Sequence, residues 1–368
     1  MAVRVVVVGG GVIGLSIAWR AATRGLAVTV VDPEPGRGAS GVAAGMLAPV
    51  TEVHYGEEEL LALNLESARR YPRFVADLEE ASGIRTGYRA SGTVAVARDA
   101  DDLAALDELV DYQRGLGLDV ERLRSRELRR LEPGLAPGVR GGAVVAGDHQ
   151  VDPRRLVAAL LIACRRAGVT LRGERAAGIR RRSVILSGGQ AVDGDAVVMA
   201  AGAWSSGLEG LPAELAALVR PVKGQIVRLR GAGTPAISRN VRGAEVYLVP
   251  RSEEEVVVGA TVEERGFDVE VTAGAVHELL RAAIELVPDV TELGLVETAA
   301  GLRPGTPDNA PLLGTTAWDD LVLATGHYRN GILLAPVTAD AVAELLATGV
   351  APTEIVAFSP RRFERVLT

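Results

Sequence analysis

The amino-terminal segment, residues 3–32, limits the possible folds more than any other part of this chain. A β-branched run ends at Val8 and is followed at once by Gly9-Gly10-Gly11-Val12-Ile13-Gly14, which fits the pattern G-x-G-x-x-G. Helical composition then extends from Leu15 to Gly25, a second apolar strand is expected over Ala27–Val31, and Asp32 follows it. Strand, glycine turn, helix, strand and acid in this order predict a dinucleotide-binding β-α-β unit.

Each residue type in this unit has a physical role in binding a dinucleotide. Gly9 permits the tight turn, Gly11 lets the backbone approach a pyrophosphate, and Gly14 lets the helix pack closely on the strand. The helix N-terminus offers free N–H groups and a positive dipole to the anion. Asp32 lies about twenty residues further on, where a carboxylate accepts hydrogen bonds from an adenosine ribose. These residues do not distinguish FAD from NAD.

The composition narrows the class of protein. A chain of 368 residues is long enough for two domains with substantial cores. Its net charge of −7 argues against general binding to nucleic acid or to a membrane surface. The single cysteine, Cys164, excludes an intrachain disulfide and a cysteine-based metal cage. With only four scattered histidines, we expect no metal site.

Targeting segments are not expected. The first strand begins at the third residue, which leaves no room for a signal peptide, and no run of about 18 apolar residues is present. The sequence therefore predicts a cytoplasmic protein without a membrane span.

The rest of the chain alternates between segments typical of a dinucleotide-binding unit and segments typical of a second sheet. Amphipathic helices are expected over Glu57–Gly83 and Ala273–Val287, and strands over Val219–Leu229, Val246–Val249 and Val256–Val262, the last two forming an antiparallel hairpin. An apolar strand over Leu321–Ala324, a glycine loop and a helix from Ile332 to Thr348 then return to the dinucleotide-binding style. We therefore expect an α/β fold, with a Rossmann-like dinucleotide-binding domain and a mixed-sheet α+β substrate domain. Both are expected to be discontinuous, with residues 1–85, 150–215 and 300–368 in the first domain and 86–149 and 216–299 in the second.

Several motifs together resemble the D-amino-acid oxidase family of flavoenzymes, and within it the enzymes that oxidise glycine for thiamine thiazole synthesis. The resemblance covers nearly the whole chain in matching order, and its most specific part is the carboxyl-terminal block. The motifs are Gly9–Gly14 with Asp32, Ala43–Leu47, Pro221–Gly224, Tyr247–Arg251, Val258–Thr261, Gly301–Thr306 and Gly326–Pro336.

The resemblance implies non-covalent FAD and assigns residues to it. Asp32 would hold the ribose, Val12 and Ile13 the pyrophosphate, and the backbone of Ala176 the adenine. The segment Ala44, Gly45 and Met46 would run along the flavin. The loop that would cradle the isoalloxazine comprises His327, Tyr328, Arg329, Asn330, Gly331, Ile332 and Leu333, and the remaining expected contacts are Gly9, Gly11, Gly14, Pro33 and Ser40. Some relatives in the family link flavin to cysteine, but Cys164 lies far from the matching loops, so no such link is expected.

The resemblance also implies a reaction. An amino acid is oxidised at its α-carbon to an imine, water releases the 2-oxo acid and ammonia, and oxygen becomes hydrogen peroxide. Arg303, with a permanent charge and a planar fork, suits the substrate carboxylate. Tyr247 could donate a hydroxyl hydrogen bond to the same group, and Arg329 could bind substrate or assist the flavin. Holding the α-carbon in place is mainly a positioning task, so no acid or base residue is strictly required. A homo-oligomer is implied, and a tetramer is suggested by the resemblance alone.

The substrate stays open at this point. Glu245 is expected on the same face as Tyr247, where an acid could favour an amine, and Val262 is a small residue that could admit larger substrates. Glycine is the first candidate, with glyoxylate as product, and sarcosine, D-alanine and D-proline are further ones. Three other classes of protein stay possible: an FAD dehydrogenase of D-amino acids with an acceptor other than oxygen, an NAD-dependent oxidoreductase, and a non-catalytic flavin-binding module.

Overall fold

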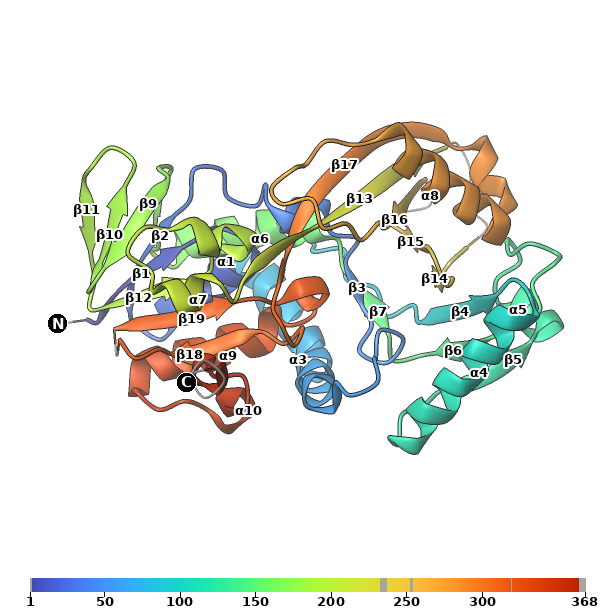
Figure 1. Ribbon diagram of the computed structural model, residues 1–368, viewed down its shortest axis with the longest axis horizontal. Coiled ribbons are helices and arrows are strands. Elements are labelled where there is room, and N and C mark those ends of the chain that lie inside the picture. Colours follow the sequence, from blue (N-terminus) through green and yellow to red (C-terminus); the bar gives the residue numbers. More distant parts are fainter. Residues whose placement is uncertain (1, 232–236, 252–253, 319, 364–368) are drawn as a thin grey trace.

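Two sheets at opposite ends of the molecule organise the fold (Figure 1). The computed structural model describes residues 2–231, 237–251, 254–318 and 320–363. A six-stranded sheet carries the amino-terminal unit, an eight-stranded sheet lies at the other end, and the short pair β3 (Met46–Leu47) and β7 (His149–Gln150) lies between them (Figure 1). The mixed α/β architecture expected from the sequence is confirmed.

The six-stranded sheet has the strand order β18-β19-β12-β1-β2-β8. All neighbours are parallel except β18 and β19, which are antiparallel. Alternation along β1 sends Val5 and Val7 to one core and Val6 and Val8 to another, so both faces of the sheet are buried. The strands are β1 (Arg4–Val8), β2 (Ala27–Val31), β8 (Thr170–Arg172), β12 (Ala196–Met199), β18 (Leu312–Thr315) and β19 (Leu321–Thr325).

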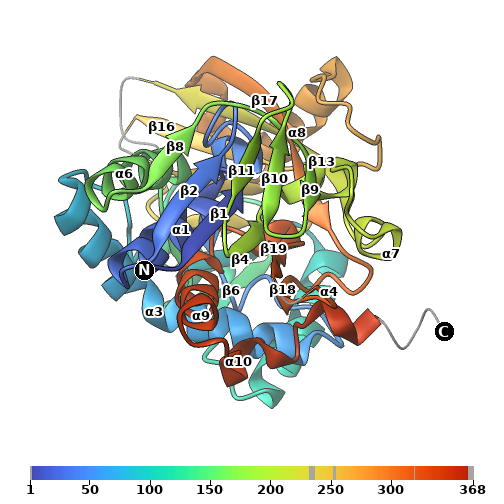
Figure 2. The same cartoon turned by 90° about the vertical axis from the view of Figure 1, so that its left-hand side faces the viewer.

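Helices cover one face of this sheet and a small antiparallel sheet covers the other (Figure 2). The long helix α3 is amphipathic as expected, and its apolar residues pack against α6 and α9. The helices are α1 (Val12–Thr23), α3 (Glu58–Ser82), α6 (Pro153–Arg166) and α9 (Ala335–Thr348). The small sheet contains β9 (Ala176–Arg180), β10 (Ser183–Leu186) and β11 (Ala191–Asp193).

The eight-stranded sheet has the order β17-β13-β16-β15-β14-β4-β6-β5 and is antiparallel except for the pair of β14 and β4. Its two faces are distinct. Val227, Leu248 and Val258 pack under α8 (Ala273–Leu286), whereas Ile226, Val249 and Val257 pack toward Ala44. The strands are β4 (Thr93–Ala97), β5 (Glu121–Arg124), β6 (Gly141–Val145), β13 (Arg220–Arg230), β14 (Asn240–Arg242), β15 (Tyr247–Pro250), β16 (Glu255–Gly259) and β17 (Gly294–Gly305).

None of the described helices is by itself long and apolar enough to cross a membrane. Helix α9 and the segment Thr353–Phe363 meet the length and composition test only as a pair, and the chain bends by 102° between them. The remaining helices are α2 (Ala39–Val42), α4 (Ala100–Gly115), α5 (Ser125–Leu131), α7 (Ala213–Ala216) and α10 (Thr353–Val356).

Three element boundaries differ by three residues from those expected. Helix α1 begins at Val12, because the last part of the glycine fingerprint already forms its first turn. Strand β16 ends at Gly259 and not at Val262, and its pairing with β13 resumes after the break, where the backbones of Lys223 and Glu263 exchange hydrogen bonds. Helix α9 begins at Ala335, with Pro336 in its first turn, where the missing N–H costs nothing.

Candidate active site

One cavity of about 610 Å³ joins the two sheets. It opens at the carboxyl ends of β1, β2, β12 and β19, the edge at which open α/β sheets bind ligands. Its other wall is the face of the eight-stranded sheet that lies opposite α8. All residues predicted to contact the cofactor line this cavity except Gly14, and so do Tyr247, Arg303 and Arg329.

The glycine turn has the geometry expected for close approach of an anion. Gly9 has φ of 107°, a left-handed conformation, and a Cβ there would strike the carbonyl of Ala200. At Gly11 a Cβ would meet only Ser40 Oγ, at 3.4 Å, so this backbone faces open space. Gly14 faces the carbonyl of Gly9, so it serves the contact between helix and turn and does not line the cavity.

Asp32 closes this end of the cavity. Its carboxylate accepts hydrogen bonds from the backbone N–H groups of Gly10, at 2.6 Å, and Glu34, at 2.8 Å. The amide of Val12 donates to Ser40 Oγ at 3.0 Å, which ties the start of α1 to the segment that follows β2. An acid beside the fingerprint and a helix N-terminus facing the same cavity fit the ribose and pyrophosphate of a dinucleotide.

The loop after β19 lines the other part of the cavity and is held from behind by α3. Tyr71 donates its hydroxyl hydrogen bond to the carbonyl of Ile332, at 3.1 Å, and Ser67 donates to that of Leu333, at 2.6 Å. His327 is buried, and its Nε2 lies 3.1 Å from Thr338 Oγ1. Burial lowers the pKa of His327 to about 3, so this imidazole is neutral at physiological pH.

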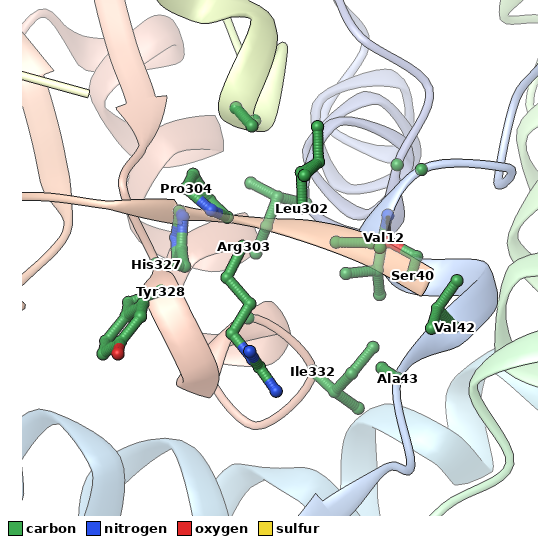
Figure 3. Close-up of a pocket in the computed structure, with 18 of the residues that line it drawn as sticks. Val12, Ser40, Val42, Ala43, Leu302, Arg303, Pro304, His327, Tyr328 and Ile332 are labelled. Atoms are coloured by element: carbon green, nitrogen blue, oxygen red, sulfur yellow. Dashed lines mark hydrogen bonds between the residues drawn. The ribbon is translucent and has the colours of Figure 1, made fainter. Parts of the chain in front are cut away.

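Arg303 projects from β17 into the cavity, toward the space bordered by Tyr328, Ile332 and Ala43 (Figure 3). Its Nη1 donates to the carbonyl oxygens of Lys223, at 3.3 Å, and Thr261, at 3.1 Å. Within the described ranges no carboxylate forms an ion pair with it. A guanidinium fixed by carbonyl oxygens and lacking a counterion is suited to bind an anionic ligand.

Tyr247 lies next to this arginine on the same wall. It is paired directly with Arg242 on β14 and with Gly259 on β16. Burial raises the pKa of Tyr247, while the charge of Arg303 acts in the opposite direction. The phenol is therefore protonated and able to donate.

Comparison with known proteins identifies the family. The family model described as "FAD dependent oxidoreductase", DAO, matches residues 4–345. The chain belongs to the DAO family. It is thus an FAD-dependent oxidoreductase, and a dinucleotide cofactor agrees with the geometry of the fingerprint and Asp32.

Among curated relatives, this DAO-family enzyme is 36% identical to the glycine oxidase of Geobacillus kaustophilus over 366 residues, which cover 97% of this chain and 96% of the relative. It is 36% identical to the "Bifunctional protein ThiO/ThiG" of Synechocystis over 98% of this chain, but over only 54% of that protein. The chain thus spans about half the length of such bifunctional relatives. The crystal structure of the Geobacillus kaustophilus glycine oxidase matches with a TM-score of 0.90 at 35% identity, covering 97% of this chain and 98% of that one. The family resemblance drawn from the sequence is confirmed.

In this DAO-family protein Arg329 differs from Arg303 in its partners. Its Nη2 lies 3.1 Å from Glu57 Oε2, and Glu57 also accepts a hydrogen bond from Asn309. The charge of Arg329 is therefore already balanced by an acid.

Sequence reasoning missed a second ion pair in the cavity. Arg242 Nη1 lies 2.9 Å from Glu52 Oε1, and both residues line the cavity together with Tyr247. Arg242 reaches the cavity because β14 pairs it with Tyr247 on β15. The sequence did not predict this position, because no strand was expected over residues 240–242. Glu52 belongs to a loop whose amides at Val50 and Thr51 are bound by the buried Asp148.

The two positions that left the substrate open both line the cavity, and Glu245 is placed differently from expectation. Glu245 is not on a strand with Tyr247; it lies in the turn before β15, and its carboxylate is 3.3 Å from Arg281 and 3.5 Å from Arg98. Its charge is thus already balanced by arginines. Val262 lines the cavity and is 67% exposed, so it leaves that side open.

Two further predictions concern residues away from the cavity. Cys164 is buried in α6, where its Sγ lies 3.3 Å from the carbonyl of Leu15. Among the described residues, no group of three or more His, Cys, Asp and Glu side chains has a metal-binding arrangement.

Proposed function

We propose that this oxidase converts glycine, with oxygen as acceptor, to glyoxylate, ammonia and hydrogen peroxide. The observation that carries the proposal is Arg303, a cation of the cavity wall held by two carbonyl oxygens and paired with no described carboxylate. A zwitterionic amino acid offers the carboxylate that this group lacks. The similarity to glycine oxidases over nearly the whole chain supports glycine as the substrate.

The residues act mainly by binding and orientation. Arg303 binds the substrate carboxylate through its fork, and Tyr247 donates a hydroxyl hydrogen bond to the same group. Together they fix the α-carbon against the flavin side of the cavity, which reduces the entropic part of the barrier. FAD, when bound, supplies the acceptor for the two electrons that leave the α-carbon. His327 is neutral and bonded to Thr338, so it shapes the cavity and transfers no proton.

A role in supplying the glycine imine for thiamine thiazole synthesis follows from the bifunctional relatives and forms part of the proposal. Sarcosine and small D-amino acids are further proposed substrates, because the side of the cavity at Val262 is open. We also propose that the enzyme works in the cytoplasm as a homo-oligomer, which cell fractionation and light scattering would test.

The first experiment is anaerobic reduction of the FAD-loaded protein. Glycine should bleach the flavin absorption band, and air should restore it with formation of hydrogen peroxide. The Arg303→Gln variant should need a glycine concentration higher by about a hundredfold or more, the cost of losing one partner of a buried charged pair. If only sarcosine or a D-amino acid bleaches the yellow protein, the substrate is that compound and not glycine. If air restores the absorption band only slowly, a dehydrogenase with another acceptor is favoured.

A further inference from the structure

The cavity wall formed by the eight-stranded sheet carries its polar side chains above glycines. Tyr247, Gly259 and Ile226 lie in one row across β15, β16 and β13. Because side chains alternate along a strand, Gly224 lies on the same face as Ile226. Arg303 is paired with Val222, two residues before Gly224, so it also shares this face. The two residues proposed to bind the carboxylate thus share a surface with two glycines.

Gly224 lies directly under the guanidinium of Arg303. A Cβ built on Gly224 would collide with Nη1, Nη2 and Cζ of Arg303, and these three atoms would be almost equally near. Three atoms of one plane at nearly equal distance mean that the guanidinium lies flat across the glycine. The carbonyls of Lys223 and Thr261 then hold the Nη1 edge of that plane.

Gly259 has the same relation to Tyr247. A Cβ built on Gly259 would lie 2.5 Å from the hydroxyl oxygen and 2.6 Å from the neighbouring ring carbons Cζ and Cε2. The polar end of the phenol therefore rests on this glycine. Any side chain here would lift the hydroxyl away from the sheet.

The other glycines of this sheet have different neighbours. A Cβ on Gly142 would meet the backbone of Ala95, one on Gly301 would meet Val42, and one on Gly294 would meet only the carbonyl of Arg230, at 3.4 Å. Gly224 does not have a left-handed φ. The backbone at Gly224 is therefore one that alanine can adopt, and the side chain of Arg303 is what excludes it.

We propose that Gly224 is a positioning residue that sets the height of the Arg303 guanidinium above the sheet, and that Gly259 does the same for the hydroxyl of Tyr247. This inference rests on the proposed role of Arg303 and Tyr247 in binding a carboxylate. Alanine at position 224 displaces the guanidinium from its two carbonyl partners, so the fork no longer meets the carboxylate held by Tyr247.

The test uses acetate, a carboxylate of substrate size, as the probe, and reads its dissociation constant from the perturbed flavin spectrum of the FAD-loaded protein. Gly224→Ala should weaken acetate binding by about tenfold or more, since a displacement near 1 Å is enough to lose such a contact. For glycine oxidation we expect KM to rise by a similar factor while kcat stays within about twofold. The matched control Gly294→Ala, on β17, should leave both constants unchanged.

A double-mutant cycle separates positioning from general damage. In an Arg303→Ala background, Gly224→Ala should change acetate binding by less than about twofold, because the side chain through which Gly224 acts has gone. If Gly224→Ala alone does not fold or bind FAD, the double variant should recover both, since the collision is removed. Failure of that recovery, or equal acetate binding by Gly224→Ala and the unaltered protein, would overturn the inference. Absence of acetate binding by the unaltered protein would instead contradict the proposed carboxylate site.

Discussion

Three arginines of the cavity wall differ in which groups balance their charge, and this difference predicts different roles for them. Arg242 is paired with Glu52, at 2.9 Å, and Arg329 with Glu57, at 3.1 Å. Arg303 has carbonyl partners only, among the residues that the structure covers. A charge that already has a counterion attracts a second anion weakly, so residue type alone would not have ranked these three.

This ranking predicts different effects of matched substitutions. Arg303→Gln should raise KM for glycine by about a hundredfold or more, whereas Arg329→Gln should raise it by less than about tenfold, because its lost charge was already balanced. Steady-state kinetics of both variants at saturating oxygen is the measurement. Equal losses in the two variants would show that Arg329 contacts the carboxylate as strongly as Arg303.

The hydroxyl of Tyr247 gives a smaller prediction at the same scale. Tyr247→Phe should weaken acetate binding by about tenfold, the value of one hydrogen bond to a charged group. Because burial raises the pKa of Tyr247, the hydroxyl should keep donating beyond the pH at which a free phenol ionises. Acetate titrations between pH 7 and about 11, one unit above the pKa of a free phenol, test both points. Tyr112→Phe, whose hydroxyl bonds Glu58 at an exposed site, is the control and should bind acetate normally.

At the scale of elements, the sequence predicted what depends on neighbouring residues and missed what depends on distant ones. The glycine turn, α1 and Asp32 follow from local spacing, and their positions in the structure agree with it. Arg303 and Tyr247 came from family motifs. Glu52 did not, because its loop is fixed by Asp148, 98 residues away from Val50, and Arg242 did not, because only cross-strand pairing brings it to Tyr247.

The Asp148 anchor makes a prediction about pH. Asp148 accepts hydrogen bonds from the amides of Val50 and Thr51 and from the hydroxyl of Thr51, yet burial raises its pKa from 3.8 to about 6. The folded state thus binds the proton more tightly than the unfolded state. The resulting stability is present in full below pH 3.8 and is lost as pH rises through about 6.

Asp148→Asn removes this titration. Between pH 4 and 7, the free energy of unfolding of the variant should rise relative to that of the unaltered protein by about 2 kcal/mol, because each pKa unit is worth about 1.4 kcal/mol and part of the difference is already lost at pH 4. Urea unfolding at several pH values measures the difference. The exposed Asp119→Asn serves as control, and parallel pH profiles for Asp148→Asn and the unaltered protein would contradict the raised pKa.

At the scale of the whole molecule, the cavity joins the two sheets, so its ligand should stabilise both. Residues from β1, β2, β19 and the segment that follows β12 line one side, and residues from β13, β14, β15 and β17 line the other. The sequence predicted the cofactor but not the shape of this shared wall, which depends on how the two sheets pack together.

Removal of FAD should therefore lower the thermal stability of the entire chain. Returning FAD at about a hundred times its dissociation constant should restore about 2.7 kcal/mol, and Tm should keep rising with FAD concentration. Calorimetry of the apoprotein with graded FAD is the measurement. A Tm that does not depend on FAD concentration would mean that the cofactor does not bind the folded state.

The single lysine of the chain, Lys223, points away from the cavity and is fully buried, with Nζ 2.7 Å from Asp268 Oδ2. The native fold therefore offers amine-directed reagents no accessible ε-amine, and a lysine-specific endoproteinase has one peptide bond to cut, within the first half of β13. Cleavage into pieces 1–223 and 224–368 can occur only after this strand has left its sheet. The rate at which those two fragments appear would thus report how often this wall of the cavity opens, without any label attached to the protein.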